Sequence, residues 1–131
     1  MLSLVLEDIP IEYRSRFRDL LEEVPRDLKD VEQELLAYIE TVRHVAKVVR
    51  LLNLDEANAL AATGITLLRE ADTTRDEVHR LVQSAIHYLI VEEDDDEITG
   101  VLGFDDDILV MNAVCRSLAR PDLVIPLTER S

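Results

Sequence analysis

Between positions 28 and 52, apolar residues recur at alternating steps of three and four, which is the spacing of a heptad seam. The seam consists of Leu28, Val31, Leu35, Tyr38, Val42, Val45, Val49 and Leu52. Further apolar residues widen the stripe at Leu36, Ile39, Ala46 and Val48. So wide a stripe favours a helix that packs against several neighbours, and a helix that pairs with a second copy of the chain is the alternative. We therefore expect one long helix, opening at Pro25, to organise the fold.

Residues that break helices are rare in the remainder of the chain. The 131 residues include 3 Gly and 4 Pro, which favours helices and argues against an all-β fold. Helical patterns cover 11–24, 25–52, 54–71, 74–91 and 106–119, and a short apolar arm precedes them at 1–9. We predict a single domain, residues 1–131, that forms an all-α bundle of about five helices. The 74–91 and 106–119 helices would form its central antiparallel hairpin.

Three local patterns refine this prediction. Thr74 followed by Glu77 has the spacing of a capping box, which marks a helix start. Gly64 lies in a stripe of mostly small residues, so we expect its helix to cross a neighbour closely. The 106–119 helix is apolar nearly all round, which predicts burial on most sides, either at the centre of the bundle or against another subunit.

Acidic residues are concentrated where the predicted hairpin turns. The formal net charge is −14, which disfavours binding to nucleic acid or to an anionic membrane, because both require Lys and Arg. No Lys or Arg occurs between Arg80 and Arg116. Within that interval, six acids lie in 92–97 and three in 105–107: Glu92, Glu93, Asp94, Asp95, Asp96, Glu97, Asp105, Asp106 and Asp107. Neighbouring carboxylates repel one another, so something is expected to relieve the repulsion.

Three interpretations of this acidic corner stay open. A hard divalent cation, Mg²⁺ or Ca²⁺, would use as ligands Asp94, Asp96, Glu97, Asp106 and Asp107, although the spacing is not that of an EF-hand. Such a metal site could be hydrolytic. A basic partner protein, or basic residues of this chain such as Arg116 and Arg120, would dock on the corner, with further contacts from Glu92, Glu93, Asp95 and Asp105. The third interpretation is a solvated loop that confers solubility.

The residues of the corner also resemble a known family. The order is Tyr88-Leu89-Ile90, Asp94, Glu97-Ile98, Leu102-Gly103-Phe104 and then Asp106-Asp107. This order, over about residues 85–118, is similar to the signature of the YkvA-like family, small helical bacterial proteins of unassigned function. The prolines of that signature are missing, since no proline occurs between Pro25 and Pro121. The resemblance implies a helix, an acidic corner and a second helix, and it implies no reaction.

Positive signs of catalysis are nearly absent, and we predict no catalytic residues. His79 and His87 lie two turns apart, too far to share a metal, and no phosphate-binding glycine loop or nucleophile motif occurs. The single cysteine, Cys115, lies in an apolar helical pattern and fits a reducing compartment. With no signal peptide and no membrane-spanning run, we expect a cytoplasmic protein. The predicted function is a non-enzymatic interaction or regulatory domain that binds a protein partner or itself, with a homodimer as one form.

Overall fold

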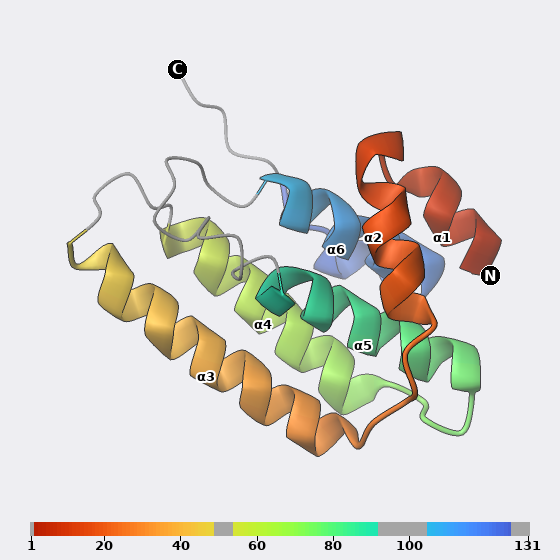
Figure 1. The fold of residues 1–131 in the computed structure, drawn as a ribbon, viewed down its shortest axis with the longest axis horizontal. Helices are drawn as coiled ribbons and strands as arrows, with labels where there is room; N and C mark the ends of the chain where they lie inside the picture. The colour runs from red at the N-terminus through yellow and green to blue at the C-terminus, as the bar shows by residue number, and fades with distance from the viewer. Residues whose placement is uncertain (1, 49–53, 92–104, 127–131) are drawn as a thin grey trace.

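The computed structural model describes residues 2–48, 54–91 and 105–126, and all regular structure in these ranges is helical. The elements in chain order are α1 (Leu2–Asp8), α2 (Ile11–Leu21), α3 (Leu28–Ala46), α4 (Leu54–Glu70), α5 (Asp76–Val91), α6 (Asp105–Ser117) and the 3₁₀ helix η3 (Pro121–Leu123). They pack into one helical bundle, as predicted (Figure 1). None of the helices in these ranges combines the length and the apolar character that a membrane span requires.

Helix α5 lies at the centre of the bundle and packs against α2, α3, α4 and α6 (Figure 1). Helices α5 and α6 run antiparallel, as contacts at both ends of the pair show. Tyr88 in the last turns of α5 bonds to Asp106 in the first turn of α6. At the opposite end, Val78 of α5 and Leu118, which follows α6, line the same hollow. This is the central hairpin that the sequence predicts.

The long helix α3 uses its apolar seam inside the molecule. Its buried residues are Leu28, Val31, Leu35, Tyr38, Ile39 and Val42, and the helix packs against α4 and α5. It begins at Leu28 rather than at Pro25, because the Asp27 side chain accepts from the Lys29 amide at 2.9 Å and caps the helix. The seam residues Val49 and Leu52 lie outside the described residues. The described seam residues of α3 thus pack against other helices of this chain. Self-association stays a prediction.

The predicted apolar arm at the N-terminus is a helix. Val5 and Ile9 are buried in the core, and α1 contacts α2 and α6. The connection to α2 is fixed by Arg14, whose Nε donates to the Ile9 carbonyl at 2.7 Å. The contact between α1 and α6 includes an ion pair, in which Arg116 Nε lies 2.7 Å from Asp8 Oδ2. Burial and these two arginines hold a helix of seven residues, which is too short to be stable alone.

Helix α6 is buried within this chain's own bundle and holds the chain that follows, whereas a contact with a second subunit stays a prediction. Its buried apolar residues are Ile108, Val110, Met111, Ala113, Val114 and Cys115. Asn112 is 6% exposed and pairs with the backbone of Ile125: Asn112 Nδ2 donates to the Ile125 carbonyl at 2.8 Å, and the Ile125 amide donates to Asn112 Oδ1 at 2.7 Å. The residues around η3 are therefore tied to α6 by one side chain.

Gly64 lies where α4 crosses its neighbours closely, as predicted. A Cβ at this position would lie 2.8 Å from Ile86 Cδ1 and 3.0 Å from Leu35 Cδ2. Both neighbours are fully buried, so the larger Gly64→Val side chain has no room. We expect this change to lower the free energy of unfolding by about 2 kcal/mol, measured with urea. This value is the net effect, since valine also has a slightly higher helix propensity than glycine. Ala62→Val at an exposed position of α4 is the control, and equal stability of the two variants would contradict the close crossing.

Candidate interaction site

Only one side of the acidic corner lies within the described residues. Glu92, Glu93, Asp94, Asp95, Asp96 and Glu97 lie outside them, as does the side chain of Asp105. Asp106 and Asp107 lie in the first turn of α6, where acids interact favourably with the helix dipole. Whether the two acidic runs converge therefore stays a prediction.

Asp106 joins a contact among three helices. Tyr88 Oη of α5 donates to Asp106 Oδ2 at 3.3 Å. The Arg16 guanidinium of α2 lies 5.6 Å from the centre of the Tyr88 ring, within the range of a cation–π contact. The ring of Phe17, also in α2, lies 6.5 Å from that of Tyr88 at an angle of 54°. Tyr88 thus fixes α2 and the start of α6 to the end of α5.

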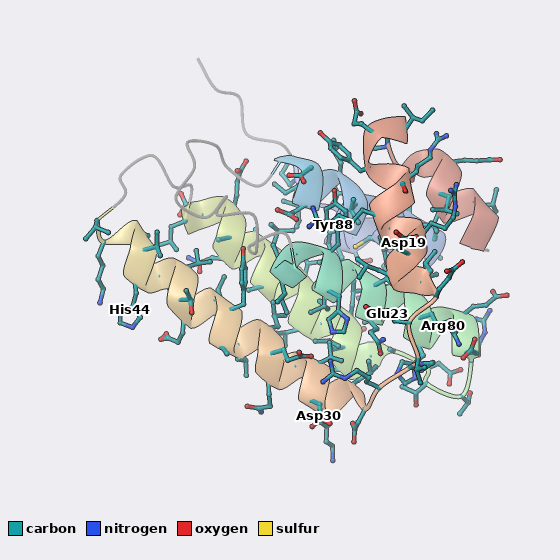
Figure 2. All side chains as sticks on the ribbon, viewed as in Figure 1. Asp19, Glu23, Asp30, His44, Arg80 and Tyr88 are labelled. Atoms are coloured by element: carbon teal, nitrogen blue, oxygen red, sulfur yellow. The ribbon has the colours of Figure 1, made fainter. Side chains whose placement is uncertain are left out.

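A hollow of about 490 Å³ lies in front of this contact, between α2, α5 and α6. We call it the α2–α6 hollow, and it is lined by Glu12, Tyr13, Ser15, Arg16, Asp19, Tyr88 and Asp106. Figure 2 shows Asp19 on α2 beside the labelled Tyr88. The lining therefore contains three carboxylates and one guanidinium, so it carries a net negative charge.

Arg116 and Arg120, which one interpretation of the sequence names as basic residues that could dock on the corner, pair with other acids. Arg116 pairs with Asp8. Arg120 pairs with Glu70 and, at 3.0 Å, with Asp122, and this contact holds the pKa of the Asp122 carboxyl below its ordinary value. Arg116 also lies about 15 Å along α6 from Asp106, given a rise of about 1.5 Å per residue. The base at the described side of the corner is Arg16, which no local sequence pattern identifies.

The described residues do not test the metal prediction, because Asp94, Asp96 and Glu97 lie outside them. Asp107 is 5% exposed, so its carboxylate is buried in the bundle. In the described ranges, no three His, Cys, Asp or Glu side chains are grouped so that they could hold a metal ion. Any Mg²⁺ or Ca²⁺ bound by Asp106 and Asp107 would need further ligands from 92–97. A metal site with Asp94, Asp96 and Glu97 stays a prediction.

A second polar feature, which sequence reasoning did not identify, lies along α5. Three of its side chains bind the backbone of residues 21–26, which comprise the last residue of α2 and most of the connection to α3. Gln83 is 1% exposed; its Nε2 donates to the Val24 carbonyl at 3.1 Å, and its Oε1 accepts from the Arg26 amide at 2.7 Å. Arg80 Nη1 donates to the carbonyls of Leu21 and Glu23, and His79 Nε2 lies 2.5 Å from the Arg26 carbonyl. We call these three residues the α5 clamp.

His87 continues the same face of α5, one turn beyond Gln83. Its Nδ1 lies 3.1 Å from Glu23 Oε1, and its Nε2 lies 3.3 Å from Glu34 Oε1. That Glu34 oxygen also accepts from Arg26 Nη1 at 2.8 Å. The polar spacing i, i+4, i+8 at His79, Gln83 and His87 was the available signal, but it does not say which segment is bound.

Comparison of the chain with family models, with curated proteins and with solved structures finds no match. The similarity to the YkvA-like family therefore stays a prediction that depends on the residues quoted above.

Cys115 has the properties of a structural thiol. It is fully buried, and burial raises the pKa of the thiol to about 11, against a smaller opposing effect of Arg120. Because the thiolate is the reactive form, iodoacetamide at about pH 8 should modify the folded protein about a hundredfold more slowly than the urea-unfolded protein. The chain has 1 Cys, so the intact mass reports this site alone. Equal rates in the two states would show that Cys115 is reactive.

Proposed function

We propose that this protein is a non-enzymatic interaction domain that binds a basic segment of a partner protein at the α2–α6 hollow. The observation that supports the proposal is the lining of this hollow. Glu12, Asp19 and Asp106 provide three carboxylates, and Arg16 provides one guanidinium. A segment rich in Arg or Lys would add the cations that this surface lacks.

The charge of the whole chain supports the same partner. Six further acids, at 92–97, lie in the segment that joins α5 to α6, the two helices that border the hollow. With a net charge of −14, the protein attracts cationic partners over a distance and repels nucleic acid. The acidic residues would therefore speed association and restrict the choice of partner.

The hollow also has residue types that suit protein recognition. Tyr13, Tyr88 and Arg16 line it, and Tyr and Arg are enriched in the contact surfaces of protein complexes. The Tyr88 ring is held by Phe17, by Arg16 and by its bond to Asp106, so it loses little freedom when a partner binds. An incoming Arg side chain could contact the aromatic rings while pairing with a carboxylate.

Binding of a fluorescein-labelled arginine–serine repeat peptide, measured by fluorescence anisotropy, tests this function. The double variant Glu12→Gln with Asp19→Asn removes two carboxylates of the hollow. Because exposed charge pairs contribute up to about 1 kcal/mol each, we expect the affinity to fall about fivefold. Affinity of the unchanged protein should also fall as salt is added.

The control carries the same change in net charge at another place. Asp30→Asn with Glu77→Gln neutralises two exposed acids, on α3 and α5, that do not line the hollow. Figure 2 shows Asp30 on α3, away from Asp19 and Tyr88. We expect less than about a twofold loss of affinity for this control. Equal losses in the two double variants would mean that only the net charge matters, and absence of peptide binding would refute the proposal.

A further inference from the structure

His87 lies at the meeting point of three segments and has a carboxylate at each of its two ring nitrogens. It is 7% exposed and belongs to α5. Glu23 belongs to the connection between α2 and α3, and Glu34 belongs to α3. The distances to Nδ1 and Nε2 are 3.1 and 3.3 Å. The His87 imidazole thus contacts both the α2–α3 connection and α3.

The number of protons on the ring decides which contacts it can make. A neutral imidazole carries one N–H, so it can donate to only one of the two carboxylates, and its other nitrogen then directs a lone pair at the second. An imidazolium carries two N–H groups and can donate to both. An oxygen lies within 3.3 Å of each ring nitrogen, so the geometry offers one acceptor to each of the two N–H groups that an imidazolium would carry.

Among the described residues that line the hollow of about 510 Å³ beside His87, the further charged group is Arg26, and the lining also includes Glu23, Val24, Glu34 and Ile90. Arg26 Nη1 pairs with Glu34 at 2.8 Å, so Glu34 keeps a cation when the ring is neutral. In the ranges that the structure describes, the Glu23 carboxylate forms its ion pair with His87. Loss of a proton from His87 thus leaves Glu23 or Glu34 facing a lone pair, and among the described residues no second cation pairs with the Glu23 carboxylate.

We infer that Glu23, His87 and Glu34 form a pH-sensitive latch that fastens the connection between α2 and α3 to α5. Both contacts are made when the imidazole is protonated, and one opens as the pH rises through the titration of the ring. Within the α5 clamp, Gln83 is a neutral donor and Arg80 a permanently charged one, and both continue to hold residues 21–26. Opening of the latch is therefore local. It frees Glu23 and the neighbouring Val24, which is 78% exposed, at the rim of the hollow.

Nuclear magnetic resonance of the ¹⁵N-labelled protein between about pH 5 and about pH 8 tests the latch, because histidine ordinarily titrates in this range. The amide signals of Glu23 and Val24 should move with the same midpoint as the imidazole signals of His87. The movement should vanish in His87→Gln and persist in His44→Gln, since His44 is an exposed histidine on α3 (Figure 2). Amides that do not titrate, or that still titrate in His87→Gln, would overturn the inference.

A double-mutant cycle with Glu23→Gln and His87→Gln gives a second readout that depends on stability. At about pH 5 we expect a coupling of about threefold in the unfolding equilibrium constant, and a smaller coupling at about pH 8. A contact with only a packing role would give the same coupling at both pH values, and that result would also overturn the latch.

Discussion

Replacing Gln83 by methionine is expected to destabilise the protein by about 3 kcal/mol, because two backbone groups lose their partner and each such loss costs about 1–3 kcal/mol. Methionine keeps the length of the side chain and suits a helix, so packing changes little. The Val24 carbonyl and the Arg26 amide, which bond to Gln83 at 3.1 and 2.7 Å, are left without it. Urea unfolding followed by circular dichroism measures the change.

Gln33→Met provides the matched control, because Gln33 is an exposed residue of α3. Its effect should stay within about 0.5 kcal/mol. If Gln83→Met proved as stable as this control, the α5 clamp would not hold the connection between α2 and α3.

The change Asn112→Leu should also cost about 3 kcal/mol, because it leaves the amide and the carbonyl of Ile125 without a partner. Both bonds are short, at 2.7 and 2.8 Å, and the site is buried. Since the contact ties the residues around η3 to α6, we expect the Ile125 amide to exchange its hydrogen much faster in the variant. Urea unfolding and hydrogen exchange measure the two effects.

Asn58→Leu serves as the comparison, because Asn58 is exposed on α4 and has a contact to Arg43 of 3.5 Å. This variant should change stability by less than about 0.5 kcal/mol. Unchanged protection of the Ile125 amide in Asn112→Leu would show that other contacts hold the C-terminal residues.

Features of the fold that depend on local periodicity could be predicted from the sequence. The seam of α3, the apolar surface of α6 and the close crossing at Gly64 each follow from residue spacing, since burial requires a continuous apolar stripe. Helix starts were less predictable. Thr74 does not cap α5, because its hydroxyl donates to Asp72 Oδ1 at 2.5 Å and the helix begins at Asp76. A polar side chain can choose between competing local bonds, and its spacing alone does not decide.

The connection between α2 and α3 shows why the remainder could not be predicted. Residues 21–26 are fixed by side chains of α5 that are 53 to 59 positions away. The sequence of the connection contains no pattern that identifies partners at such a distance along the chain. The candidate site has the same property: Asp106 was identified from its acidic neighbours, whereas Glu12, Arg16 and Asp19 come from a helix far away in sequence. The acidic pattern of the sequence identified the α6 side of the hollow. The α2 side could be identified only from the fold.

The central claim is that a basic segment binds in the α2–α6 hollow, and its most direct test is residue-level mapping. The arginine–serine peptide is titrated into ¹⁵N-labelled protein, and the amide shifts are followed by nuclear magnetic resonance. The account predicts that the largest shifts fall on Glu12, Arg16, Asp19 and Asp106, while Asp30 and His44 of α3 stay unchanged. Shifts confined to 92–97, or spread evenly over α3 and the hollow alike, would contradict it.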